Sequence, residues 1–239
     1  MKNLLINFIH SQNNANSINV NVPFGRYSGI IIRKAGVHTT TVSETDITDN
    51  IVVNVAGVQR VNASMFSLIN LNKFSEGYLP ETTGTTFEFN VYIPVEFISS
   101  NESPAGVLIN NIFAGATSNE ISIYGVMSLN EIYSSETISE FSKTSSTKEL
   151  FELDSARVLY LYSPTPSSFT NVEVIDSETN EILVSAPYSV VKIVSDIFTN
   201  SVGAVNGVMI DIGQYRKVKL IITSSTSHTY KVLSVGMKL

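Results

Sequence analysis

The stretch SSETISEFSKTSSTK, residues 134–148, decides how the chain is divided. It consists of serine, threonine and charged residues, and Ile138 and Phe141 are its only large apolar side chains. Short apolar or alternating runs, broken by turn residues, lie on both sides of it, which is the pattern of β-strands joined by loops. The sequence therefore predicts an all-β protein with two domains, residues 1–133 and 149–239, joined by a linker at 134–148.

The clearest predicted strand is Phe87–Phe97, FEFNVYIPVEF, in which every second residue is apolar from Phe87 to Phe97. This period of two predicts a strand with one face in the core. Because Pro94 cannot donate a ladder hydrogen bond, we expect the strand to lie at a sheet edge or to be bulged there. Further strands are expected at 1–10, 18–22, 28–34, 51–55, 65–71, 107–113, 120–129, 157–162, 172–175, 182–184, 208–212, 217–223 and 230–239. Val190–Ile197 is compatible with a strand or a short helix, and neither half shows a long helical stripe.

Composition excludes several classes of protein. Only 15% of the 239 residues are charged and 43% are hydrophobic, so much of the surface is expected to be neutral and suited to burial against partners. The net charge of −6 and the scattered basic residues argue against a nucleic-acid groove. The chain has no cysteine, which excludes disulfides, thiolate nucleophiles and Cys-ligated zinc. It also lacks the run of about 18 apolar residues that a membrane-spanning helix requires.

The sequence contains no motif that indicates an enzymatic reaction. The three histidines, His10, His38 and His228, are far apart in sequence, and none belongs to an HExxH pair. The sequence also contains no GxSxG elbow, no phosphate-binding P-loop and no GxGxxG motif. We therefore expect no enzyme activity, no catalytic residues and no cofactor.

Two acidic clusters are candidate calcium sites, because hard cations prefer oxygen ligands crowded into a loop. The first contains Glu44, Asp46 and Asp49, and the second contains Asp176 and Glu178 in the connection of a predicted hairpin. Neither cluster has the spacing of an EF-hand loop. Asp, Asn, Ser and Thr also favour turns, where their side chains bind the backbone, so the second interpretation is that both clusters are ordinary turns.

The tandem all-β halves, the alternating strand Phe87–Phe97 and the joint at 134–148 together resemble the double jelly-roll major capsid proteins of tailless icosahedral phages that enclose a membrane. The two halves also end alike, in Tyr124–Leu129 and Ser234–Leu239, each with a methionine two positions before a leucine. Chance similarity of short apolar strands is the alternative explanation of these endings. The second half, about ninety residues, is short for a jelly roll of eight strands.

This resemblance implies two tandem jelly-roll β-sandwiches and a structural role in a virion shell. Members of the family form homotrimers of pseudo-hexagonal outline that tile the shell. The implied partners are copies of the chain itself, neighbouring capsomers and other capsid proteins such as a penton or spike protein. The segment Met1–His10 is either an ordinary first strand or a contact to the internal membrane. The implied location is the virion, after synthesis in the host cytoplasm, with no direct contact to nucleic acid.

Two other classes of function remain open from the sequence. The first is a binding module, such as a phage receptor-binding or baseplate component or an adhesin domain, with Tyr27, Tyr78, Tyr92 or Tyr124 as surfaces on which a glycan stacks. The second is a jelly-roll lyase or hydrolase, for which no residue pattern gives support.

Overall fold

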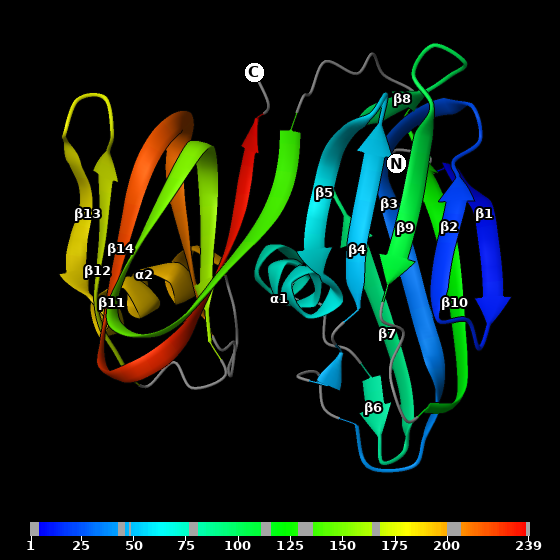
Figure 1. The fold of residues 1–239 in the computed structure, drawn as a ribbon, viewed down its shortest axis with the longest axis horizontal. Helices are drawn as coiled ribbons and strands as arrows, with labels where there is room; N and C mark the ends of the chain where they lie inside the picture. Colours follow the sequence, from blue (N-terminus) through cyan, green and yellow to red (C-terminus); the bar gives the residue numbers. More distant parts are fainter. Residues whose placement is uncertain are drawn as a thin grey trace. The chain divides into compact units, whose positions relative to one another are not determined.

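The computed structural model describes residues 5–42, 46–47, 49–76, 81–110, 116–128, 136–163, 168–199 and 207–237 (Figure 1). The chain divides into two compact units. Unit 1 comprises Met1–Asn72 and Tyr78–Thr137, and unit 2 comprises Lys73–Gly77 and Ile138–Leu239. The division after Thr137 falls inside the stretch 134–148 that the sequence singles out.

Unit 1 is built from two antiparallel sheets. Its strands are β1 (Leu5–Asn13), β2 (Ser17–Asn21), β3 (Gly25–His38), β4 (Asn50–Val55), β5 (Val58–Ser64), β6 (Glu81–Thr83), β7 (Thr86–Ile93), β8 (Phe97–Ser99), β9 (Ala105–Asn110) and β10 (Ala116–Met127). One sheet has the order β1-β10-β3-β7-β6, with β8 paired to the start of β3, and the other has the order β5-β4-β9-β2.

The order of these strands is that of a jelly roll. If the three-residue strands β6 and β8 are set aside, one sheet takes the first, eighth, third and sixth strands, and the other takes the fifth, fourth, seventh and second. Except at the β4–β5 hairpin, each strand is therefore followed by a strand of the opposite sheet. Two interlocked Greek keys of this kind define a jelly-roll sandwich.

Strand β7 confirms the predicted alternation. Phe87, Phe89, Val91 and Ile93 are all buried, and the rings of Phe87 and Phe89 stack at a centroid distance of 5.8 Å. The strand ends at Ile93, and Pro94 follows in the gap before β8. Strand β6 pairs only with residues 86–88, so among the described residues the half of β7 that leads to Pro94 lies at the sheet edge.

Helix α1 (Met65–Glu76) lies where a strand was expected at 65–71, and that prediction is wrong. The Ser64 hydroxyl accepts a hydrogen bond from the Ser67 N–H at 3.3 Å, which is the geometry of an N-cap. At the other end of the buried segment, the Asn72 amide donates to the Tyr92 carbonyl and accepts from the Tyr92 N–H, both at 2.7 Å. The side chain of Asn72 thus provides both hydrogen bonds to the backbone of Tyr92 on the edge strand β7.

Unit 2 contains β11 (Glu136–Tyr162), β12 (Phe169–Asp176), β13 (Ile182–Pro187), helix α2 (Tyr188–Thr199) and β14 (Gly207–Met237). Within the unit the strand order is β13-β12-β14-β11. Strands β11 and β14 bend back on themselves, so each passes through the unit more than once (Figure 1). The three strands expected between 208 and 239 therefore form one continuous element, and the ambiguous segment Val190–Ile197 is helical.

The predicted linker at 134–148 is wrong in its conformation, because residues from Glu136 onward belong to β11. Ile138 is buried, and the Glu140 carboxylate accepts a hydrogen bond from the Tyr162 hydroxyl at 2.9 Å. The ammonium of Lys231 lies 3.6 Å from the same carboxylate. A polar run can thus form a strand when its polar groups have partners on neighbouring strands of the sheet.

The two units repeat the same hairpin and helix. In unit 1 the hairpin β4–β5 leads directly into α1, and in unit 2 the hairpin β12–β13 leads directly into α2. The sheets β5-β4-β9-β2 and β13-β12-β14-β11 correspond strand by strand in this order. The similar sequences ending in Met127 and Met237 lie at the ends of β10 and β14, the last strand of each unit. The two similar sequences therefore occupy corresponding positions, at the end of the last strand of each unit.

Candidate functional site

The first candidate calcium cluster contains a buried ion pair. Asp49 accepts a hydrogen bond from the ammonium of Lys34, and both side chains are fully buried. Burial lowers the pKa of Lys34, and the nearby carboxylate of Asp49 opposes this shift. The Asp49 carbonyl also accepts the Met65 N–H at 2.8 Å, where α1 begins. Asp46 is exposed, and Glu44 lies outside the described residues.

The second cluster is an Asx turn at the β12–β13 hairpin. One carboxylate oxygen of Asp176 accepts the backbone N–H groups of Glu178 at 2.9 Å and Thr179 at 3.0 Å, and the other accepts from Arg216 at 3.0 Å. These donors, the backbone groups first, lower the pKa of Asp176 to about 2. Within the described part of the chain, no three His, Asp or Glu side chains gather as metal ligands.

A serine–histidine cluster lies in unit 2. The hydroxyl of Ser163 contacts Nε2 of His228, and Nδ1 of His228 lies 3.2 Å from the Ser168 hydroxyl. The imidazole packs edge-on against the rings of Phe169 and Tyr230, and burial lowers its pKa. Ser163 is fully buried, so a substrate cannot reach its hydroxyl. The imidazole, on β14, joins Ser163, directly after β11, to Ser168, directly before β12, and we interpret the cluster as structural.

The tyrosines considered for glycan stacking are mostly engaged. Tyr27 is fully buried and stacks on Phe97 at 5.1 Å, so its predicted role as a stacking surface is wrong. The Tyr92 hydroxyl donates to the Ser28 carbonyl at 3.0 Å. Tyr124 is half-buried, and Tyr78 lies outside the described residues.

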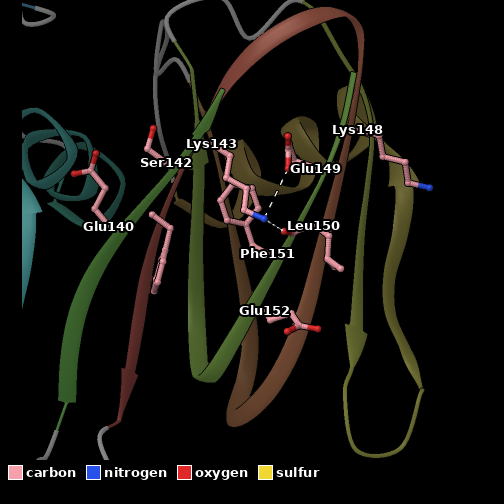
Figure 2. Close-up of a pocket in the computed structure, with 9 residues that line it drawn as sticks. Glu140, Ser142, Lys143, Lys148, Glu149, Leu150, Phe151 and Glu152 are labelled. Atoms are coloured by element: carbon pink, nitrogen blue, oxygen red, sulfur yellow. Dashed lines mark hydrogen bonds and ion pairs between the residues drawn. The ribbon is translucent and has the colours of Figure 1, made fainter. Parts of the chain in front are cut away.

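A groove of about 880 Å³ opens between the two arms of the first bend of β11, lined by residues 140–143 and 148–152 (Figure 2). Lys143 reaches across it, contacting the Leu150 carbonyl and lying 3.8 Å from the Glu149 carboxylate. The Lys143 ammonium also lies 5.1 Å from the centre of the Phe151 ring. The lining carries both signs of charge, so it provides no field that selects a charged small molecule.

The outer face of one sheet of unit 1 carries an apolar row. Phe8, Tyr124, Ile31 and Tyr92 are successive register partners across β1, β10, β3 and β7. Phe8 is 57% exposed, and its ring meets that of Tyr124 edge-on at 5.7 Å. Tyr124, Ile31 and Tyr92 are half-buried, so the row is only partly open to solvent and Phe8 is its most exposed side chain.

The same sheet face also carries a charged network next to this row. Arg33 donates two hydrogen bonds to the Glu88 carboxylate, at 3.0 and 3.1 Å, and lies 3.6 Å from Glu120. The hydrogen bond from Arg33 lowers the pKa of Glu88. One guanidinium and two carboxylates leave the network with a net charge of −1, and it forms a polar rim beside the apolar row, as at the edge of a protein interface.

Helix α2 exposes a second apolar surface, which we call the α2 stripe. It consists of Val190, Ile193, Val194 and Ile197, at the i, i+3, i+4 and i+7 spacing that places side chains on one side of a helix. Ile193 is 61% and Ile197 is 68% exposed. The opposite side of the helix is buried in the core of unit 2 through Tyr188 and Val191. The helix therefore has apolar residues on two sides, of which its own unit covers one.

Comparison with solved structures places the whole chain in one class of fold. The crystal structure of the STIV major capsid protein superimposes with a TM-score of 0.68 at 9% sequence identity, covering 97% of this chain and 95% of that chain. A chain from the atomic structure of Sulfolobus Turreted Icosahedral Virus gives 0.70 at 11% identity, covering 97% and 90%. The major capsid protein P2 from Bacteriophage PM2 gives 0.59 at 14% identity, covering 99% and 98%.

No protein-family model matches the sequence, and no curated protein matches it. The similarity is thus one of architecture along the full length of the chain. The chain has the double jelly-roll fold, as the sequence predicts.

Proposed function

We propose that this protein is the structural major capsid protein of a tailless, membrane-containing icosahedral bacteriophage, and that it assembles as homotrimers of pseudo-hexagonal outline. The observation that carries the proposal is the structural match of 97% of this chain to the STIV major capsid protein and of 99% to P2 of PM2, with both units included. A fold alone does not fix a function, so the proposal also draws on the exposed apolar surfaces of both units.

The repeat within the chain gives the trimer its outline. Three chains around a threefold axis bring together six units of similar architecture, and hexagonal blocks can tile a shell. The α2 stripe supports this arrangement, because exposed apolar patches of this kind are usually covered by partners. The partners would be other copies of the chain, neighbouring capsomers, and a penton or spike protein.

The N-terminal strand supports a contact beneath the shell. Ile6 and Phe8 are both more than half exposed on β1, at the edge of its sheet. In the proposed virion this segment touches the internal membrane by lying on it. Among the described residues, no helix has the length and apolarity to cross a bilayer.

The proposed role is structural and not enzymatic, and its site is the virion after synthesis in the host cytoplasm. The net charge of −6 supports contacts to protein and not to nucleic acid.

Light scattering on the purified chain tests the proposal. We expect a species of three times the chain mass of 26.1 kDa at micromolar concentration. A monomer at all concentrations and ionic strengths would overturn the proposed function. Binding to a glycan array by such a monomer would instead support a receptor-binding or adhesin module.

A further inference from the structure

Helices α1 and α2 occupy the same position in the repeat of the two units. Each has twelve residues, and each begins directly after the second strand of a hairpin, α1 at Met65 and α2 at Tyr188. When these first residues are aligned, the buried Met65 and Leu68 correspond to the buried Tyr188 and Val191. The same side of both helices is therefore used for packing in the core.

The two helices differ on their other side. In α1 the described residues at the positions of the α2 stripe are all buried, namely Ser67, Asn70 and Leu71. In α2 the corresponding residues are exposed, namely Val190, Ile193 and Val194. The chain thus covers this side of the first helix and leaves the same side of the second helix open, although the second carries the larger apolar side chains.

We infer that the α2 stripe is covered by a second copy of this chain when the protein assembles. The inference rests on the proposed function and specifies which surface forms the contact. Among the described residues this side is covered on α1 and open on α2, and a second copy of the chain can supply the cover that α2 lacks. In a ring of identical chains, each copy can supply it to the next by a head-to-tail contact, which closes after a fixed number of copies.

The charges on α2 favour a protein partner over a lipid surface. A helix that lies on an anionic membrane usually has several Lys or Arg residues beside its apolar face. Helix α2 carries only Lys192 and Asp196 as charged residues, and these form an ion pair with each other one turn apart. The helix is therefore neutral, and its stripe presents no attraction for phosphate groups. Depletion of charge around an apolar centre is typical of the core of a protein interface.

A double variant tests the inference through the mass of the assembly. Ile193→Lys with Ile197→Lys places two ammonium groups in the stripe, on exposed positions where lysine is a good helix former. We expect the circular dichroism spectrum and the melting temperature of the isolated chain to be retained. The concentration for half-assembly should rise by roughly a hundredfold or more, because truncated or charged interface anchors have effects of that size.

Ile182→Lys is the matched control, since Ile182 is 65% exposed on β13, outside the stripe. The control should assemble like the wild type. If the wild type and the double variant form the same oligomer at the same concentration, the inference about α2 is wrong and the capsid proposal stands. If the wild type never assembles, the proposed function fails as well.

A labelling experiment gives a second, independent measurement. Because the natural chain has no cysteine, Ile193→Cys and Ile182→Cys each introduce a single thiol. In the assembled protein the thiol at 193 should react with maleimide at least about tenfold more slowly than in the diluted monomer, while the thiol at 182 should react at the same rate in both. Equal rates at 193 in both states would show that the stripe stays open and would overturn the inference.

Discussion

Replacing Lys34 with methionine should destabilise unit 1 strongly. The substitution keeps an unbranched side chain as far as Cε but removes the ammonium that pairs with Asp49. It leaves a carboxylate at a site where neither side chain is exposed to solvent. Removing one partner of a buried ion pair costs about 3–5 kcal/mol. At about 2–4 °C per kcal/mol for a domain of this size, the melting temperature of unit 1 should fall by roughly 6–20 °C.

Thermal unfolding of the full chain, followed by calorimetry and circular dichroism, measures this effect. Arg33→Met is the matched control, because Arg33 is the neighbouring residue on β3 and its ion pair with Glu88 is partly exposed. We expect that variant to lose about 1 kcal/mol or less. The double variant Lys34→Met with Asp49→Leu should recover at least half of the loss, since an apolar pair of similar volume can replace a buried ion pair. The reasoning is refuted if Lys34→Met costs no more than Arg33→Met.

Four further perturbations test unit 2. Burial lowers the pKa of His228 from its ordinary value of 6.5, so the unfolded chain binds a proton more readily and the free energy of unfolding should fall as pH drops below 6.5. In His228→Asn the free energy of unfolding should lose this part of its pH dependence. The same pH dependence in the variant and the wild type would contradict the account. The pKa of Asp176 is lowered to about 2, so its carboxylate should stabilise the fold above pH 3.8 and lose that effect as pH falls toward 2. In a denaturant titration, Asp176→Ala should not show this loss of stability between pH 3.8 and pH 2. Excess calcium should leave the melting temperature unchanged, because donors already occupy this carboxylate, and a rise that Asp176→Ala abolishes would establish a calcium site instead. Gly236→Ala would bring a Cβ to 1.9 Å from the Ser155 carbonyl oxygen and should lower the free energy of unfolding by about 1–3 kcal/mol. An unchanged free energy of unfolding in the same titration would show that β11 and β14 can separate at this point.

The strands with one buried face could be predicted from the sequence because their period is visible in it. Phe87–Ile93 alternates strictly, and the structure buries the apolar residues of this run. The β12–β13 hairpin was equally accessible, since Asp176 and its neighbours combine turn preference with apolar flanks. Turn chemistry and period two are local properties, so they need no knowledge of the rest of the fold.

The helical period of α1 and α2 could not be recognised in the sequence. Residues 65–71 are apolar or buried on every side, so α1 shows no polar face and its period cannot be distinguished from that of a buried strand. The available signal was Ser64, which caps the helix through the Ser67 N–H. Helix α2 is rich in β-branched residues and apolar on two sides, which obscured its period for the same reason.

The polar stretch 134–148 was misread because its stabilising partners are distant in sequence. Within this run, Glu140 contacts Tyr162 and Lys231, which follow it by 22 and 91 positions in the sequence. The pairing of Lys34 with Asp49 was missed likewise, since nothing in the sequence shows which of several acidic residues meets a lysine in the core. Such contacts follow from the topology and not from local pattern.

The share of this chain in the protein of purified virus particles tests the central claim most directly. Quantitative mass spectrometry of particles banded on a density gradient measures it, together with negative-stain images of the shell. As a major capsid protein the chain should be the most abundant protein in the particles, in an ordered lattice of pseudo-hexagonal capsomers. Its absence from the particles, or its presence only as a minor component at a vertex, would contradict the account.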